Sequence, residues 1–128
     1  MQRPSLEGRH VLIVEDEPII AYDIAQAFEP TGAVLTTTTT LEHALILAQQ
    51  DNLSAAILDH ALPDGDSSEL CKILKQRDIP FIVYSGLGPS SAACKEARHL
   101  SKPADPQLLV TVLQDMILGT KSAIDQRN

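Results

Sequence analysis

Residues 55–65 read AAILDHALPDG, a short apolar run that ends at Asp59 and is followed by a turn-rich segment. Earlier in the chain, residues 11–17 read VLIVEDE, which is again an apolar run followed at once by acidic residues. Near-continuous apolar runs of this length are typical of strands buried on both faces of a parallel sheet. The two segments therefore predict two inner strands whose carboxyl ends carry acids.

Three further apolar runs, at residues 33–37, 81–84 and 99–101, bring the expected strands to five. The segments between the runs have helical periodicity, except over residues 89–97, where we expect a short or irregular fourth helix. This alternation predicts an α/β fold with a doubly wound, flavodoxin-like parallel sheet of strand order 2-1-3-4-5. The last helix has the clearest apolar stripe, at Leu108, Leu109, Val112, Leu113, Met116 and Ile117.

The segment after Asp59 is rich in residues that form turns and helix caps. Residues 66–69 read DSSE and have the spacing of a capping box at the start of the third helix. We interpret Asp64 and Asp66 as turn and cap residues of this loop. The alternative, that they help to bind a metal ion, stays open.

Length and charge restrict the class of protein. The chain has 128 residues, which fits one domain, predicted over residues 9–118 between polar tails at 1–8 and 119–128. The net charge of -7 repels nucleic acid phosphates. No apolar run approaches the roughly 18 residues of a membrane span, and the N-terminus lacks the apolar core of a signal peptide. We therefore expect a cytoplasmic protein that binds neither nucleic acid nor membranes.

The cysteines and histidines show no metal-ligand spacing. Cys71 and Cys94 lie 23 residues apart, outside any CxxC pattern. Two isolated thiols in a cytosolic chain more often fill apolar positions than form a disulfide or a metal site, so we expect buried thiols. A zinc site is not expected from the scattered histidines, which are His10, His43, His60 and His99.

Chemically active residues follow four of the five expected strands. In a doubly wound sheet, ligands bind at the carboxyl ends of the strands, so the residues at these ends should converge on one edge. The converging set is Glu15, Asp16, Glu17, Asp59, Ser85 and Lys102.

The carboxylates of Glu15, Asp16 and Asp59 would lie in a small volume, where they repel one another unless a cation is present. A hard cation such as Mg²⁺ relieves this repulsion. It keeps several of its bound waters and uses only one or two carboxylates as direct ligands. A carboxylate such as Asp59 is also a nucleophile toward phosphorus and can form an acyl phosphate. The Lys102 ammonium and the Ser85 hydroxyl would then stabilise charge on the phosphoryl oxygens.

The order VLIVEDE, AAILDHALPDG, a strand ending in Ser-Gly and then Lys-Pro resembles the receiver domain of two-component response regulators. The resemblance covers about residues 8–118. It implies that Asp59 is the phosphoacceptor and also a Mg²⁺ ligand, that Asp16 binds the metal directly, and that Glu15 holds it through water. The backbone carbonyl of Ala61 would be the third protein ligand.

The same resemblance assigns roles at the ends of the last two strands. Ser85 matches the switch hydroxyl, and Lys102 matches the lysine that contacts the phosphoryl group, with a peptide bond to Pro103 that is usually cis in such domains. His99 stands where many receivers have a Tyr or Phe whose rotation reports phosphorylation. An imidazole could serve as this switch and add pH sensitivity, or His99 could be an ordinary histidine at the strand edge.

The sequence also departs from the common receiver pattern. Ser85 and Lys102 are 17 residues apart, fewer than usual, and the missing residues fall in the weak fourth helix. This resembles the single-domain receivers of alphaproteobacteria that partner kinases of the HWE or related types, although Ala104 replaces their aromatic residue. Ala61 and Leu87 should rim the phosphoryl group without orienting water, which predicts a long-lived phosphoaspartate.

The expected function is therefore that of a single-domain response regulator rather than an enzyme. It would accept a phosphoryl group on Asp59 from a histidine kinase or phosphotransfer protein, and act on a downstream protein or as a phosphate sink. Two alternatives remain open. One is a pseudo-receiver that signals without phosphate, and the other is a Mg²⁺-dependent phosphatase or phosphotransferase.

Overall fold

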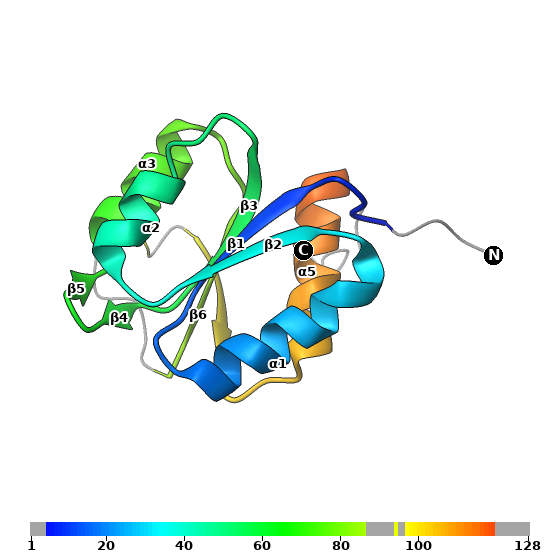
Figure 1. The fold of residues 1–128 in the computed structure, drawn as a ribbon, viewed down its shortest axis with the longest axis horizontal. Helices are drawn as coiled ribbons and strands as arrows, with labels where there is room; N and C mark the ends of the chain where they lie inside the picture. Colours follow the sequence, from blue (N-terminus) through cyan, green and yellow to red (C-terminus); the bar gives the residue numbers. More distant parts are fainter. Residues whose placement is uncertain (1–4, 87–93, 95–96, 120–128) are drawn as a thin grey trace.

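A computed structural model describes residues 5–86, 94 and 97–119 of the chain. One parallel sheet of five strands lies at its centre, in the order β2-β1-β3-β6-β7 (Figure 1). This order equals 2-1-3-4-5 when only the strands of this sheet are counted, so the predicted flavodoxin-like topology is confirmed. The strands are β1 (His10–Val14), β2 (Val34–Thr38), β3 (Leu53–Leu58), β6 (Phe81–Ser85) and β7 (Arg98–Ser101).

Helices cover both faces of the sheet. Helices α1 (Pro18–Phe28) and α5 (Pro106–Leu118) lie on one face, while α2 (Leu41–Leu47) and α3 (Ser68–Gln76) lie on the other (Figure 1). Each of these four helices corresponds to a segment whose apolar periodicity predicted a helix. The predicted fourth helix lies almost wholly outside the described residues. None of the helices within the described ranges has the length and apolar character that crossing a bilayer requires.

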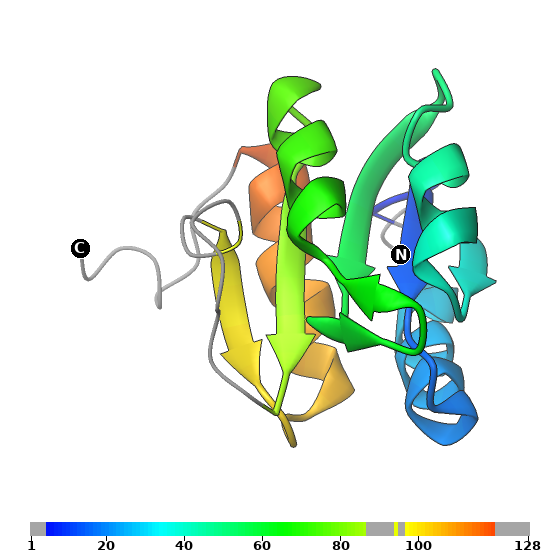
Figure 2. The same ribbon diagram turned by 90° about the vertical axis from the view of Figure 1, so that its left-hand side faces the viewer.

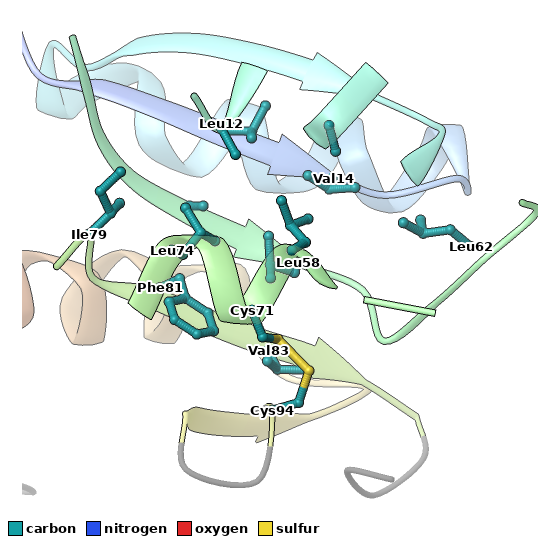
Figure 3. Close-up of a cluster of buried hydrophobic side chains, with 14 residues drawn as sticks. Leu12, Val14, Leu58, Leu62, Cys71, Leu74, Ile79, Phe81, Val83 and Cys94 are labelled. Carbon is teal, nitrogen blue, oxygen red and sulfur yellow. A yellow bond between two sulfur atoms is a disulfide. The ribbon is translucent and has the colours of Figure 1, made fainter. Parts of the chain in front are cut away.

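Each helical layer encloses its own apolar core against the sheet. The core beneath α1 and α5 includes Ile13, Phe28 and Leu109. The core beneath α2 and α3 includes Leu58 and Leu74 (Figure 3). The inner strands are buried on both faces, which is the physical reason that their sequences are almost continuously apolar.

The N-terminal segment differs from the expected loose tail. Leu6 is fully buried in the core beneath α1 and α5. Its backbone N–H donates to the carbonyl of Thr31 at 2.8 Å, at the end of a short 3-10 helix (Glu29–Thr31). A single leucine in a polar stretch gives no periodic signal, so its burial could not be read from the pattern.

The prediction of two unpaired thiols is wrong. Cys71 in α3 and Cys94 form a disulfide, with their Cα atoms 5.6 Å apart (Figure 3). Both residues are fully buried, as expected, within the core beneath α2 and α3. Their proximity is a tertiary contact, and a separation of 23 residues does not reveal it.

Two short strands follow β3 and form a hairpin outside the main sheet. They are β4 (Ala61–Leu62) and β5 (Gly65–Asp66), which pair antiparallel. The predicted capping box at residues 66–69 is not formed as expected. Ser67 is the residue before α3, but its side chain makes no cap hydrogen bond, and Asp66 accepts from the N–H of Ser68 at 3.0 Å. The buried Ser67 hydroxyl instead donates to the carbonyl of Asp59.

Candidate functional site

The carboxyl ends of the parallel strands reach the same edge of the sheet (Figure 2). Strand pairing still holds the backbone of the residues that follow them. The N–H of Glu15 donates to the carbonyl of Thr38 at 3.0 Å, and the N–H of Asp59 donates to that of Val14 at 2.9 Å. These hydrogen bonds fix the backbone of both acids at the carboxyl edge of the sheet.

Lys102 joins the predicted site residues. Its Nζ lies 2.9 Å from Oε1 of Glu15, 3.2 Å from Oδ2 of Asp59 and 3.9 Å from Oε2 of Glu17. The Lys102 backbone is held as well, because its N–H donates to the carbonyl of Ser85 at 3.0 Å. The peptide bond to Pro103 is cis, which confirms that expectation. The structure thus brings together residues that are up to 87 positions apart in the chain.

Burial and neighbouring charges shift the protonation of this cluster. Burial raises the pKa of Glu15, the negative charge of Asp59 raises it further, and hydrogen bonds from Lys102 and the Glu17 N–H only partly oppose this. Burial alone would lower the pKa of Lys102, but its hydrogen bonds to Glu15 and Asp59 outweigh burial, so that pKa is raised. The lysine therefore remains an ammonium that offsets part of the acidic charge.

The acids offer hard oxygen ligands for a divalent cation. One carboxylate oxygen from each of Glu15, Asp16 and Glu17 lies within 4.8 Å of the others. Glu15, Glu17 and Asp59 place three carboxylates within 3.9 Å of the Lys102 ammonium, so negative charge exceeds the positive charge of this lysine. Closely spaced carboxylate oxygens with excess negative charge fit Mg²⁺, which prefers such ligands. Ala61 begins β4, two residues after Asp59.

The two predicted switch residues lie on neighbouring strands. Ser85 is buried at the end of β6 and pairs with Ser101 of β7. His99 lies in β7, partly buried, with Nε2 2.5 Å from the carbonyl oxygen of Cys94. His99 therefore contacts Cys94, the residue that the disulfide joins to α3. Leu87, predicted to rim the phosphoryl group, lies outside the described residues.

The hairpin after Asp59 is attached to α2 by Asp64. Its carboxylate accepts from the N–H of Leu41 at 2.7 Å and from that of Glu42 at 3.0 Å. These hydrogen bonds lower the pKa of Asp64. Gly65 lets the hairpin approach closely, because its φ is 147° and an added Cβ would meet Leu41 at 3.1 Å. The interpretation of Asp64 as a cap residue is confirmed, but the helix it caps is α2.

The sequence did not predict a second group of hydrogen bonds around the site, made by the hydroxyls of Tyr84 and Ser67. The Tyr84 hydroxyl accepts from the N–H of Ala104 at 3.0 Å and donates to the carbonyl of the same residue at 3.2 Å. The Ser67 hydroxyl holds the carbonyl of Asp59. Hydroxyl residues within a strand or before a helix usually indicate packing or capping, so neither pattern pointed to these contacts.

Comparison with known proteins decides the family. The response regulator receiver domain model matches residues 11–114, a span that contains every predicted site residue. The chain belongs to the response regulator receiver domain family. Receiver domains generally bind Mg²⁺ in an acidic pocket, and Glu15, Asp16 and Glu17 form such an acidic cluster here.

Relatives and solved structures agree with this assignment. The chain is 30% identical over 104 residues to the photosynthetic apparatus regulatory protein RegA of Cereibacter sphaeroides, covering 76% of this chain and 56% of RegA. It is 40% identical over 120 residues to the response regulator SaeR of Staphylococcus aureus, covering 88% of this chain and 52% of SaeR. The chain thus spans about half the length of these curated relatives.

A solved structure of a putative response regulator from Chloroflexus aurantiacus is similar over almost its whole length. It is 26% identical, with a TM-score of 0.75, covering 88% of this chain and 99% of that one. The receiver domain described here therefore shares both sequence and fold with response regulators, which are signalling proteins.

Proposed function

We propose that Asp59 accepts a phosphoryl group from a histidine kinase or a phosphotransfer protein, and that this modification passes a signal to another protein. The observation that carries this proposal is the position of the Lys102 ammonium, between Asp59 at 3.2 Å and Glu15 at 2.9 Å. A cation between two carboxylates at the edge of the sheet is suited to holding an incoming dianion against a carboxylate nucleophile.

The transfer is a displacement at phosphorus. A carboxylate oxygen of Asp59 forms a bond to phosphorus, and the bond from phosphorus to the imidazole nitrogen of the donor phosphohistidine breaks, leaving the electron pair on that imidazole. Lys102 then exchanges one carboxylate contact for a phosphoryl oxygen. This exchange is inexpensive because the ammonium keeps its hydrogen bond to Glu15 throughout.

The acidic cluster would hold Mg²⁺ during this step. Asp16, Asp59 and the carbonyl of Ala61 would be direct ligands, and Glu15 would act through water. The metal supplies positive charge that offsets repulsion between the phosphoryl group and the carboxylates. The protein supplies the positions: Glu15 and Asp59 are fixed through their backbone N–H groups at the ends of adjacent strands.

Ser85 and His99 would transmit the change. The buried Ser85 stands at the end of β6, where its hydroxyl could bind a phosphoryl oxygen. His99 lies on the neighbouring strand β7, where its imidazole contacts the carbonyl of Cys94. Phosphorylation would then shift a two-state equilibrium of this region.

The proposal is tested by incubating the protein with acetyl phosphate and Mg²⁺ and measuring its intact mass. We expect a gain of one phosphoryl group in the wild type, no gain in Asp59→Asn, and an undiminished gain in the control Asp51→Asn, an exposed acid before β3. No gain in the wild type would favour the pseudo-receiver alternative. An equal gain in Asp59→Asn would show that another residue accepts the phosphate.

A further inference from the structure

Tyr84 is a buried tyrosine next to the site that the proposed transfer does not yet use. It lies in β6 directly before Ser85, is 6% exposed, and packs in the core beneath α1 and α5. A buried phenol hydroxyl needs hydrogen-bond partners, and Tyr84 finds both of them on one residue, Ala104. Ala104 lies two positions after Lys102, in the connection between β7 and α5.

These two hydrogen bonds restrain the loop that carries Lys102. Upstream, the N–H of Lys102 is bound to the carbonyl of Ser85 at 3.0 Å. Downstream, the Tyr84 hydroxyl binds both backbone groups of Ala104. Because Ser85 and Tyr84 are adjacent in β6, one short piece of strand holds the loop on both sides of the lysine.

The aromatic ring also contacts the lysine itself. The Nζ of Lys102 lies 5.6 Å from the centroid of the Tyr84 ring, within the range of a cation–π interaction. The ammonium is therefore directed by the ring as well as by Glu15 and Asp59. Of these partners, Asp59 is the one whose charge changes when a phosphoryl group is attached, whereas the ring is uncharged in both states.

Packing around the loop is incomplete. A cavity of about 180 Å³ lies between α1 and the loop, lined by Ile20, Ile24, Tyr84, Lys102, Pro103 and Pro106 among others. Side chains of α1 thus do not fill the space beside the loop. The hydroxyl of Tyr84 adds two hydrogen bonds to the backbone of Ala104, beside the packing of that residue against the core beneath α1 and α5.

We propose that Tyr84 is a positioning residue for phosphoryl transfer, which holds the Lys102 ammonium against Asp59 through the loop from Lys102 to Ala104. This inference rests on the proposed function of Asp59. It assigns to the phenol hydroxyl a part in the rate of transfer, separate from the contribution of the ring to the core.

The test uses Tyr84→Phe, which keeps the ring and removes the hydroxyl, and Tyr22→Phe, an exposed tyrosine of α1, as the matched control. Saturation kinetics with acetyl phosphate and Mg²⁺ should show a maximal rate lowered about three- to tenfold in Tyr84→Phe, because the variant loses both hydrogen bonds to Ala104. Mg²⁺ affinity, measured calorimetrically without a phosphodonor, should change less than about twofold, because no metal ligand is altered.

A double-mutant cycle separates positioning from a general structural role. If Tyr84 acts through Lys102, the variant Lys102→Ala/Tyr84→Phe should be phosphorylated no more slowly than Lys102→Ala alone. An unchanged rate in Tyr84→Phe, or a further loss of the same size in the Lys102→Ala background, would overturn the inference. A wild type that takes up no phosphate would instead refute the function of Asp59, so the two failures are distinguishable.

Discussion

The carboxyl edge of the sheet and the face beneath α2 and α3 are held together by different kinds of interaction. Around Asp59, the chain is fixed by hydrogen bonds and ion pairs that a metal ion or phosphoryl group can replace. Under α3, the residue Cys94 is joined covalently to Cys71 inside an apolar core. We therefore expect ligands to rearrange the charged edge readily, whereas Cys94, which His99 contacts, can move only as far as the disulfide allows.

The largest expected effect tests the charged edge. Lys102→Ala leaves Glu15 and Asp59 without their shared cation and removes a donor for the phosphoryl oxygens. We expect the rate of phosphorylation by acetyl phosphate to fall about 100- to 1000-fold. The exposed Lys72 provides the control, because Lys72→Ala removes a similar charge from the surface of α3. Equal rates in both variants would show that Lys102 has no part in transfer.

The disulfide can be tested by its effect on stability. Removing it from the wild type with a reductant, or by the substitutions Cys71→Ala and Cys94→Ala together, frees a loop of 23 residues in the unfolded chain. The chain-entropy relation gives a loss of about 3 kcal/mol in the free energy of unfolding. Urea unfolding with and without reductant measures this loss. Identical midpoints would mean that the bond contributes no stability. The contrast between the charged edge and the core beneath α2 and α3 would then disappear.

A smaller effect should follow from Ser67→Ala. This fully buried hydroxyl links the start of α3 to the carbonyl of Asp59, so it connects the two sides of the comparison. Its loss should lower the free energy of unfolding by about 1 kcal/mol. Ser101→Ala, at an exposed position of β7, should have little effect in the same urea experiment. A Ser67→Ala protein as stable as the wild type would remove this link.

The smallest expected effect concerns Asp64 and depends on pH. Hydrogen bonds from Leu41 and Glu42 lower the pKa of Asp64 below its ordinary value of 3.8. A depressed pKa in the folded state stabilises the protein above pH 3.8, and this stabilisation is lost as the pH falls through the folded-state pKa. Asp64→Asn should therefore lower the thermal midpoint slightly at pH 7, and the difference should vanish in acid. A difference that grows in acid would contradict the cap.

Most of the fold could be predicted because its inner strands are buried on both faces. Burial makes VLIV at 11–14 and FIVY at 81–84 continuously apolar, and five such runs alternating with helices leave few possible topologies. The burial of Leu6 and the pairing of Cys71 with Cys94 could not be predicted, because each depends on a contact between distant segments that leaves no periodic pattern.

The candidate site was predictable for a related reason. Its acids and Lys102 follow directly after strands, and strand ends converge in any parallel sheet. The supporting contacts of Tyr84, Ser67 and Asp64 were not predictable. They join a side chain to a backbone group of another segment, and the identity of that segment is known only once the fold is known.

The central claim is that Asp59 itself carries the phosphate, and it can be tested at the level of the residue. The protein would be incubated with acetyl phosphate and Mg²⁺ and then treated with borohydride, which reduces an acyl phosphate of aspartate to homoserine. Peptide mass spectrometry would then locate the homoserine. Homoserine at position 59, and its absence from untreated protein, is the predicted result; homoserine at position 16 instead of position 59 would contradict the account.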